Sequence, residues 1–354
     1  MVSPLPKRSR SSSEDSAEAL EAKKPRALVP HVAGTLVAAV DPQRRRSGLQ
    51  APTMQLTGAT GEVLTGQFDP SGQFVASAGF DRHVLLWRTY GDCPNYGLLQ
   101  GHRGPVLQVL WTADSAHLYS ASTDRTLALW DTASGERVRR LRGHGAIVNC
   151  VARPGVTTTV ASGSDDGTVR LWDPRERPAV AILAGRAPVT ALAYAPDGDQ
   201  LYAGGLDNLI RVWDVRQRTV RSTLAGHTDT VTGLALHPEG GLLLSYAMDS
   251  TARVWDVRPF APAERCQRTL EGAPAGFERN LVKPAWSADG EFAATGGADR
   301  TVTVWDHRSG QLVAKLAGHK GNVNQVDFHP REPILLSAST DRTLLLGEYD
   351  FGAR

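Results

Sequence analysis

The sequence predicts an all-β protein in which seven four-stranded blades close into a β-propeller, preceded by a disordered tail. Three observations support this prediction. A tryptophan recurs about every 42 residues, an aspartate stands six residues before each tryptophan, and short β-prone runs fill the space between them. A repeat of roughly 40–45 residues with four strands per unit is typical of propeller blades.

The tryptophan repeat is regular over most of the chain. The spacings between successive members are 43, 42, 41, 42 and 50 residues. The members are Trp87, Trp130, Trp172, Trp213, Trp255 and Trp305, and the preceding aspartates are Asp81, Asp124, Asp166, Asp207, Asp249 and Asp299. A seventh aspartate, Asp341, is followed by Gly347-Glu348 where the tryptophan would fall. Seven units are therefore expected.

Each unit divides into four short strands. In the unit ending at Trp130, apolar and β-prone runs cover residues 106–111, 117–121, 126–130 and 137–141, with Ala-Asp-Ser, Thr-Asp-Arg and Ser-Gly-Glu segments between them. Runs of this length between turn residues are typical of strands rather than helices.

The two ends of the repeat region predict how the ring closes. Residues 54–58 resemble the last strand of a unit, yet they come first in the chain. The residues after Gly318 supply only three strands. The N-terminal strand is therefore expected to complete the last blade, which removes an exposed sheet edge.

The charge distribution separates a tail from the repeats. Residues 1–52 hold nine Lys/Arg against five Asp/Glu, which leaves 30 against 32 in the rest of the chain. We expect a disordered basic tail over residues 1–52 and a propeller over residues 53–350. A nucleic-acid binder that relied on neutralising phosphates would usually carry excess positive charge on its folded part. Direct RNA binding is therefore not expected.

Two basic clusters in the tail, Lys7-Arg8-Ser9-Arg10 and Lys23-Lys24-Pro25-Arg26, resemble a bipartite nuclear-import signal. A solvated charged tail is the other interpretation. No apolar run is long enough for a membrane span or follows the N-terminal charges as in a secretory signal. Cys93, Cys150 and Cys266 lie far apart and are expected to be ordinary thiols in a reducing compartment.

These repeats identify the chain as a member of the WD40-repeat family, and the resemblance covers about residues 53–350. Five of the six tryptophans are followed by Asp. Three blades also carry a Gly-His, a Ser and the turn Asp in fixed register. These sets are His102/Ser120/Asp124/Trp130, His144/Ser162/Asp166/Trp172 and His227/Ser245/Asp249/Trp255. The resemblance implies that each set forms a buried hydrogen-bond chain from Trp to Ser to His to Asp.

A Ser-His-Asp catalytic triad is the alternative interpretation of these sets. A triad occurs once in an enzyme, whereas this set recurs from blade to blade, so a structural role is favoured. Several blades depart from the pattern. The blade of Trp213 has Arg186 for the His and Ala203 for the Ser, the first and sixth blades have Ala59 and Ala273 for the His, and the last has Gly347 for the Trp.

No catalytic, cofactor-binding or metal-binding residues are predicted, and the protein is not expected to be an enzyme. A partner would bind the rim formed by the turns before the third strands, or the segments that exceed the repeat. The candidate partner-binding residues are Phe80, Leu206, Met248, Tyr90, Phe260 and Phe277. Grouped apolar side chains that face solvent usually mark a protein interface. Filling of the channel mouth without a partner, and tolerated insertions, are the alternatives.

The irregular segments narrow the resemblance. Residues 77–82, the Tyr90-Gly91-Asp92-Cys93 segment, residues 162–172, residues 253–262 and the Phe328-His329-Pro330 segment are similar to the WD-repeat subunits of the U5 small nuclear ribonucleoprotein. This resemblance implies a nuclear scaffold in pre-mRNA splicing. Its partners would be the large central scaffold protein of that particle and other spliceosomal proteins, with RNA contacted only indirectly and the protein monomeric within the complex. A ubiquitin-ligase substrate receptor or a chromatin-binding propeller is the alternative.

Overall fold

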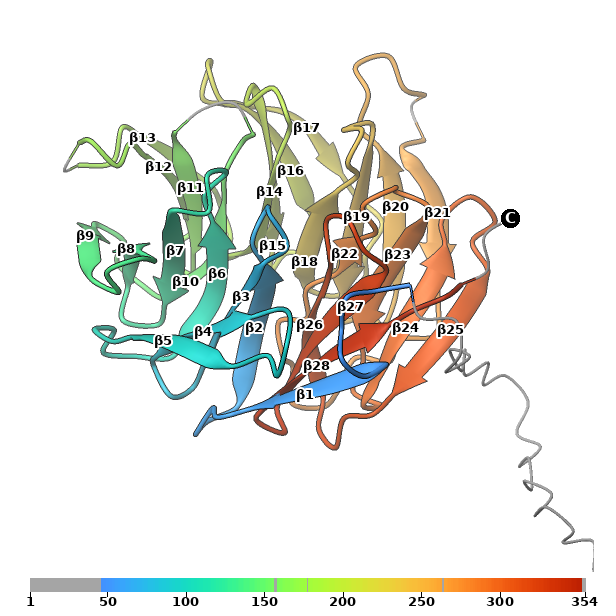
Figure 1. The fold of residues 1–354 in the computed structure, drawn as a ribbon. Helices are drawn as coiled ribbons and strands as arrows, with labels where there is room; N and C mark the ends of the chain where they lie inside the picture. Colours follow the sequence, from blue (N-terminus) through green and yellow to red (C-terminus); the bar gives the residue numbers. More distant parts are fainter. Residues whose placement is uncertain (1–45, 156–157, 177, 263, 352–354) are drawn as a thin grey trace, which may run out of the picture. The chain divides into compact units, whose positions relative to one another are not determined.

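The structure is a computed structural model that describes residues 46–155, 158–176, 178–262 and 264–351. These residues form 28 strands and no α-helix. The strands make seven four-stranded antiparallel sheets, which are the blades of a propeller (Figure 1). The predicted fold class is confirmed. The predicted disorder of the tail and its two basic clusters concern residues that lie, up to position 45, outside the described part.

The first four blades follow the chain in order. Blade 1 contains β2 (Val63–Phe68), β3 (Phe74–Gly79), β4 (Val84–Arg88) and β5 (Asn95–Leu99). Blade 2 contains β6 (Val106–Trp111), β7 (His117–Ser122), β8 (Thr126–Asp131) and β9 (Arg137–Arg142). Blade 3 contains β10 (Val148–Ala152), β11 (Val160–Ser164), β12 (Thr168–Trp172) and β13 (Ala181–Ala184). Blade 4 contains β14 (Val189–Tyr194), β15 (Gln200–Gly205), β16 (Ile210–Asp214) and β17 (Thr219–Leu224).

The last three blades complete the ring. Blade 5 contains β18 (Val231–Leu236), β19 (Leu242–Ala247), β20 (Ala252–Asp256) and β21 (Cys266–Leu270). Blade 6 contains β22 (Ala285–Trp286), β23 (Phe292–Gly296), β24 (Thr301–Asp306) and β25 (Leu312–Ala317). Blade 7 contains β26 (Val323–Phe328), β27 (Ile334–Ser339) and β28 (Thr343–Glu348), and its fourth strand is β1 (Thr53–Thr57).

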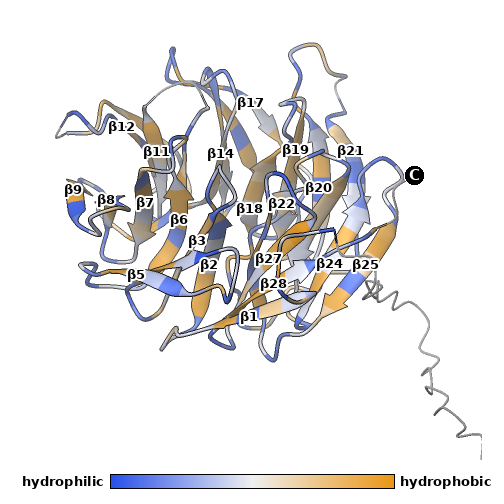
Figure 2. Ribbon diagram, viewed as in Figure 1, coloured by the Kyte–Doolittle hydropathy of each residue, from blue (hydrophilic) through white to orange (hydrophobic). Residues whose placement is uncertain are grey.

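The chain closes the ring as predicted. Strand β1 pairs antiparallel with β28, with Thr53 opposite Gly347 and Leu56 opposite Leu344. The first strands of neighbouring blades contact one another around the ring, and β2 of blade 1 contacts β26 of blade 7. Apolar residues gather on the strands, whereas the connections are mainly hydrophilic (Figure 2). The hydrophobic core therefore lies between neighbouring blades, as in the cluster that joins Leu86 of blade 1 to Trp111 and Trp130 of blade 2.

The residues just before β1 also pack against the ring. Leu49 is buried and forms an isolated parallel bridge with Gly91 in the β4–β5 connection of blade 1. The Gly48 N–H donates to Glu332 Oε2 in blade 7 at 2.7 Å, and the Tyr90 hydroxyl donates to Glu332 Oε1 at 2.5 Å. The seam between blades 7 and 1 is thus covered by chain that precedes the closing strand.

The seven blades share a hydrogen bond that defines one end of the propeller. In each blade, the residue before the turn Asp donates its N–H to a carbonyl in the connection that enters the blade, at 2.9–3.0 Å. The donors are Phe80, Thr123, Asp165, Leu206, Met248, Ala298 and Thr340, and the acceptors are Glu62, Pro105, Ile147, Pro188, Thr230, Pro274 and Asn322. We call the end of the propeller that carries these turns and connections the entry face.

Polar side chains on four of the innermost strands each join a blade to the next one. Asn149 and Asn324 donate to the carbonyls of Val189 and Val63, at 2.9 and 2.8 Å. Thr232 donates to Val282 O at 3.0 Å. A hydrogen bond of the same kind joins Thr190 and Val231. Each donor occupies the second position of the inner-strand motif, next to the β-bulge that interrupts most of these strands. These bonds satisfy backbone carbonyls at or just before the start of the next blade and so join neighbouring blades.

Candidate functional site

The three complete residue sets form closely similar hydrogen-bond chains. In blade 2, Trp130 Nε1 donates to Ser120 Oγ at 2.8 Å, Ser120 Oγ lies 2.7 Å from His102 Nε2, and His102 Nδ1 lies 3.0 Å from Asp124 Oδ2. The corresponding distances are 2.8, 2.7 and 2.8 Å in blade 3. In blade 5 they are 2.8, 2.6 and 2.9 Å. Each chain therefore links the connection that enters a blade to the second strand, the third strand and the turn between those two strands.

The chemistry of these chains differs from that of a catalytic triad in one respect. Ser120, Ser162 and Ser245 are fully buried, and each hydroxyl oxygen already accepts the indole N–H. A nucleophile must reach the substrate carbonyl, and these oxygens have no access to solvent. The arrangement satisfies buried polar groups instead.

The titration behaviour of these groups follows from burial and hydrogen bonding. Burial lowers the pKa of His144 and His227, against the opposing effect of the Asp166 and Asp249 carboxylates. Burial works to raise the pKa of Asp124, but hydrogen bonds from His102, Thr126 and the Arg103 N–H hold that pKa well below its usual range. The neutral imidazoles of His144 and His227 and the ionised carboxylate of Asp124 are therefore the forms that the folded chain favours near pH 7.

Blade 7 contains a fourth network that lacks only its tryptophan. His319 Nδ1 lies 3.0 Å from Asp341 Oδ2, and His319 Nε2 lies 2.8 Å from Ser337 Oγ. The sequence reasoning did not assign His319 and Ser337 to a network because Gly347 stands in the place of the Trp. The signal was nevertheless present, since His319 precedes Asp341 by 22 residues, the same interval as from His102 to Asp124.

The remaining blades satisfy the turn Asp or the third-strand Trp in other ways. In blade 4, where Arg186 and Ala203 replace the His and Ser, Asp207 forms an ion pair with Arg211. In blade 6, Lys315 Nζ lies 2.8 Å from Asp299 Oδ2, and Trp305 donates to the Glu271 carbonyl at 2.9 Å. In blade 1, Trp87 still donates to Ser77 Oγ at 2.9 Å.

Four of the six candidate partner-binding residues lie at the entry face. Phe80 and Leu206 occupy the turns of blades 1 and 4 and are 53% and 55% exposed. Met248 occupies the same turn of blade 5 and is half-buried. Phe277, in the connection between blades 5 and 6, is fully exposed. The four residues belong to different blades, so they form a discontinuous set around the rim.

The connection that carries Phe277 is held on both sides. The Ala275 N–H donates to Ser250 Oγ at 2.9 Å, and Asn322 Nδ2 donates to Glu278 Oε2 at 2.7 Å. The first bond reaches back to blade 5 and the second reaches forward to the connection before β26. The Phe277 ring therefore faces solvent from a segment whose neighbours are anchored.

The other two candidates lie at the opposite end. Residues Thr89 and Val257, which begin the connections to the outer strands, donate to the carbonyls of Gln73 and Gly241 in the turns between first and second strands. Tyr90 and Phe260 follow them. Phe260 is fully exposed, whereas the Tyr90 hydroxyl is bonded to Glu332 within the seam between blades 7 and 1. The six residues are thus not brought together on one surface.

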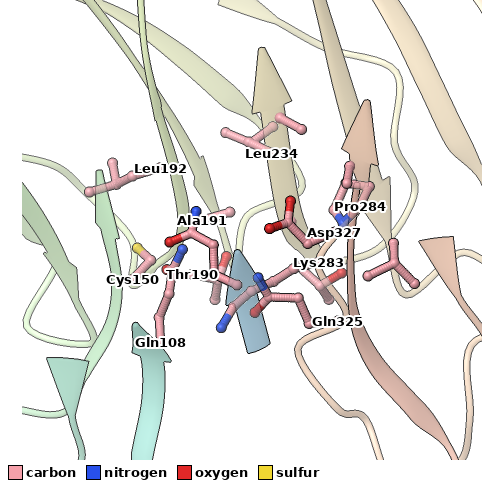
Figure 3. Close-up of a pocket in the computed structure, with 16 residues that line it drawn as sticks. Gln108, Cys150, Thr190, Ala191, Leu192, Leu234, Lys283, Pro284, Gln325 and Asp327 are labelled. Carbon is pink, nitrogen blue, oxygen red and sulfur yellow. The ribbon is translucent and has the colours of Figure 1, made fainter. Parts of the chain in front are cut away.

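The central channel contains a polar pocket of about 170 Å³ (Figure 3). Lys283, from the segment before β22, crosses it and donates to the Leu107 carbonyl of blade 2. Burial lowers the pKa of Lys283 to about 7 and raises the pKa of Asp327 to about 7. Asp327 Oδ2 accepts the Phe68 N–H at 2.8 Å. The sequence analysis did not single out either residue, because each is an isolated departure from the repeat.

Two further findings apply only to residues with a described position. No group of three or more His, Cys, Asp or Glu side chains is arranged to hold a metal ion there. No helix in that part of the chain is long and apolar enough to cross a membrane.

Seven segments of the chain match the family model described as "WD domain, G-beta repeat". They cover residues 50–88, 94–131, 135–173, 178–214, 218–256, 264–306 and 310–346. Together with the closed ring of seven blades and the four Ser-His-Asp networks, these matches show that the chain belongs to the WD40-repeat family.

Similar proteins of known name are found within that family. The chain is 50% identical to the "U5 small nuclear ribonucleoprotein 40 kDa protein" of Homo sapiens over 316 residues, which cover 89% of this chain and 88% of that protein. It is 44% identical to "Pre-mRNA-splicing factor cwf17" of Schizosaccharomyces pombe over 307 residues, 86% of this chain and 90% of that protein. A "Guanine nucleotide-binding protein subunit beta" of Saccharomyces cerevisiae is 27% identical and is covered over 66% of its length. The narrower resemblance to the U5 subunits is confirmed.

Proposed function

We propose that this protein is a non-catalytic scaffold of the U5 small nuclear ribonucleoprotein and acts in pre-mRNA splicing in the nucleus. The observation that carries the proposal is the 44–51% identity, over 86–89% of the chain, to proteins named as splicing factors and U5 components. Proteins that share only the general blade pattern, such as the G-protein β subunit at 27% identity, are much less similar, so the likeness extends beyond that pattern.

The non-catalytic part of the proposal rests on the networks. The Ser-His-Asp constellations recur in four blades among the described residues, and the serine of each is buried. They stabilise blades. A scaffold needs such rigidity, because a surface that is already ordered pays less entropy on binding.

We infer that the main partner is the large central scaffold protein of the particle, and that the entry face contributes to this contact. Phe80, Leu206, Met248 and Phe277 support this inference because exposed apolar side chains on a rigid surface favour a protein partner. RNA would be reached through that partner, since the folded part carries 30 basic against 32 acidic residues. Residues Lys7–Arg10 and Lys23–Arg26 would direct nuclear import.

Cross-linking mass spectrometry on the native complex tests the proposal. The tagged full-length chain, expressed at its normal level, is purified from nuclear extract and cross-linked. We expect cross-links to U5 proteins, with the largest number to the central scaffold protein. Cross-links confined to ubiquitin-ligase subunits or to histones would overturn the proposal and favour a substrate receptor or a chromatin-binding propeller.

A matched pair of variants tests the face. Phe277→Ser alters the entry face, and Phe260→Ser alters an equally exposed ring at the opposite end. We expect Phe277→Ser to reduce recovery of the central scaffold protein and Phe260→Ser to leave it near the wild-type level. Because both rings are fully exposed, neither change should lower the stability of the propeller.

A further inference from the structure

Four arginines occupy a backbone conformation that arginine disfavours. The residue after the turn Asp has a positive φ in every blade, between 65° and 78°. Blades 3, 4 and 5 place Gly167, Asn208 and Ser250 at this position. Glycine and asparagine adopt the left-handed backbone conformation readily. Blades 6, 7, 1 and 2 place Arg300, Arg342, Arg82 and Arg125 there.

The four blades with arginine are consecutive around the ring. Blade 7 contacts blade 1 through β26 and β2, so the arginines follow one continuous arc of the entry face. A non-glycine residue held in the left-handed region is a cost that folding alone would avoid by using Gly or Asn. The equivalent turns of blades 3 and 4 carry Gly167 and Asn208, so the backbone of this turn does not require arginine.

Other cations extend this arc. Arg103 and Lys320 lie in the connections that enter blades 2 and 7, and Arg279 lies in the connection that enters blade 6. We call the set Arg279, Arg300, Lys320, Arg342, Arg82, Arg103 and Arg125 the basic arc. All seven side chains are exposed, and none forms an ion pair within the part of the chain that the structure describes.

The nearby carboxylates are largely engaged by other groups. Asp124 and Asp341 accept hydrogen bonds from His102 and His319, and Asp299 is paired with Lys315. Arg140 and Lys315 compensate the charges of Asp124 and Asp299, whereas the arginines of the basic arc form no ion pair among the described residues. On the opposite arc, blades 3 to 5 offer the single exposed cation Arg186 at the corresponding connections and turns. The entry face is thus electrostatically one-sided although the folded chain is nearly neutral.

We propose that the basic arc binds an acidic segment of a partner protein that also carries apolar side chains. Phe80 lies two residues before Arg82, and Phe277 lies two residues before Arg279, so exposed rings alternate with cations along the arc. Carboxylates would pair with the arginines while leucine-like side chains cover the rings. The inference rests on the proposed scaffold function and specifies its partner chemistry.

A protein segment fits this arc better than an RNA strand. The exposed carboxylate of Glu62 and that of Asp81 lie among the cations, where they would repel a continuous row of phosphates. Discrete acidic side chains can avoid them. Two phenylalanines on separate blades also give no run of stacking platforms for successive bases.

Fluorescence anisotropy with the full-length protein tests the inference. One probe is a labelled peptide of alternating glutamate and leucine, and the other is an oligouridylate of the same net charge. The arc variant replaces Arg82, Arg125, Arg300 and Arg342 with Asn, which suits the left-handed turn and should leave thermal stability equal or higher. The control variant replaces four exposed arginines outside the arc, Arg175, Arg218, Arg221 and Arg308, with Asn.

We expect the wild type and the control to bind the peptide with an affinity that falls as salt rises. The arc variant should bind about tenfold more weakly, the combined effect of four exposed charge pairs. Unchanged peptide binding by the arc variant would overturn the inference, as would a wild type that binds no peptide. Tighter, arc-dependent binding of the oligouridylate would assign the arc to RNA instead. Each outcome is separate from the cross-linking test, because loss of the U5 cross-links would refute the scaffold function whatever the peptide result.

Discussion

Leu56 on β1 lies opposite Leu344 on β28, 288 residues later in the chain. Leu56 is 3% exposed and belongs to the same core cluster as Val63, Leu344 and Leu346. A residue near the start of the described chain therefore fills the core of the final blade.

Replacing Leu56 with Ala should destabilise the whole propeller rather than fray its end. Loss of a buried leucine side chain costs about 2–5 kcal/mol, and the affected strand closes the ring. The midpoint of urea unfolding measures the effect. Leu98→Ala is the matched control, because Leu98 lies on the outer strand of blade 1 with its side chain half exposed. Equal midpoints for the two variants would contradict the closing role of β1.

Because the network of blade 7 lacks its tryptophan, loss of its serine should lower the free energy of unfolding less than loss of the serine from a complete network. Ser120→Ala leaves both Trp130 Nε1 and His102 Nε2 without their partner, whereas Ser337→Ala leaves only His319 Nε2. A buried polar group that loses its partner costs about 1–3 kcal/mol. We therefore expect Ser120→Ala to lower the free energy of unfolding more than Ser337→Ala does. Ser134→Ala, at an exposed turn of the same blade as Ser120, should change little; a larger loss for Ser337→Ala would refute the account.

Replacing the Asp327 carboxylate in the channel with an amide should raise the stability of the fold by an amount that depends on pH. Burial raises the pKa of Asp327 to about 7 from its usual value near 4. The folded chain therefore retains this proton up to about pH 7, while the unfolded chain releases it above about pH 4. Stability from this group is complete below the lower value and is lost as the pH rises to the upper one.

Asp327→Asn reproduces the protonated form at every pH and can still accept the Phe68 N–H. Its stability relative to the wild type should grow between about pH 4 and about pH 7, the window between the unfolded and the folded pKa, and then level off above it. Urea midpoints at several pH values measure the difference. Asp92→Asn, at an exposed position, serves as control. A difference that stayed constant across this range would show that Asp327 is ionised in the fold throughout.

Loss of the Glu332 side chain should loosen the chain locally, before β1, rather than destabilise the whole propeller. Its two carboxylate oxygens accept the Gly48 N–H and the Tyr90 hydroxyl, so Glu332→Ala removes one direct anchor of the chain before β1 and also frees the Tyr90 side chain beside it. Hydrogen exchange should accelerate around residues 46–52, with β10 to β20 unaffected. Glu291→Ala, in an exposed turn of blade 6, should leave exchange in residues 46–52 as in the wild type. Protection that survives Glu332→Ala would place the anchor elsewhere.

The blade number, the strand order and the closing strand could be predicted because each depends on a repeated local signal. The Trp-Asp spacing counts the blades, and the resemblance of residues 54–58 to the other closing strands predicts their pairing with the last blade. The three hydrogen-bond networks were implied by the family resemblance in the same way. The predictions depended on repetition, since seven similar segments must fold alike.

Features that occur once gave no such signal. Lys283 reaches the Leu107 carbonyl across the channel, and no spacing relates the two residues. The contact of Tyr90 with Glu332 joins an inserted segment to a turn 242 residues away. The candidate interface residues lie at two ends of the propeller, and which end each one occupies depends on the strand connections that only the structure shows. The position of the arginines in left-handed turns depends on backbone dihedrals that the sequence pattern does not reveal.

The pairing of β1 with β28 has a consequence for how the protein is made. A ribosome synthesises β28 long after β1, so β1 leaves the exit tunnel with nothing to pair with. At roughly 5–20 residues per second, it waits for about 15–60 s. During that interval the six intervening blades can assemble, but the ring stays open and an apolar strand edge is available to other chains. The ring can therefore close only after β28 has left the tunnel, and until then the unpaired strand edge is a surface that chaperones could bind.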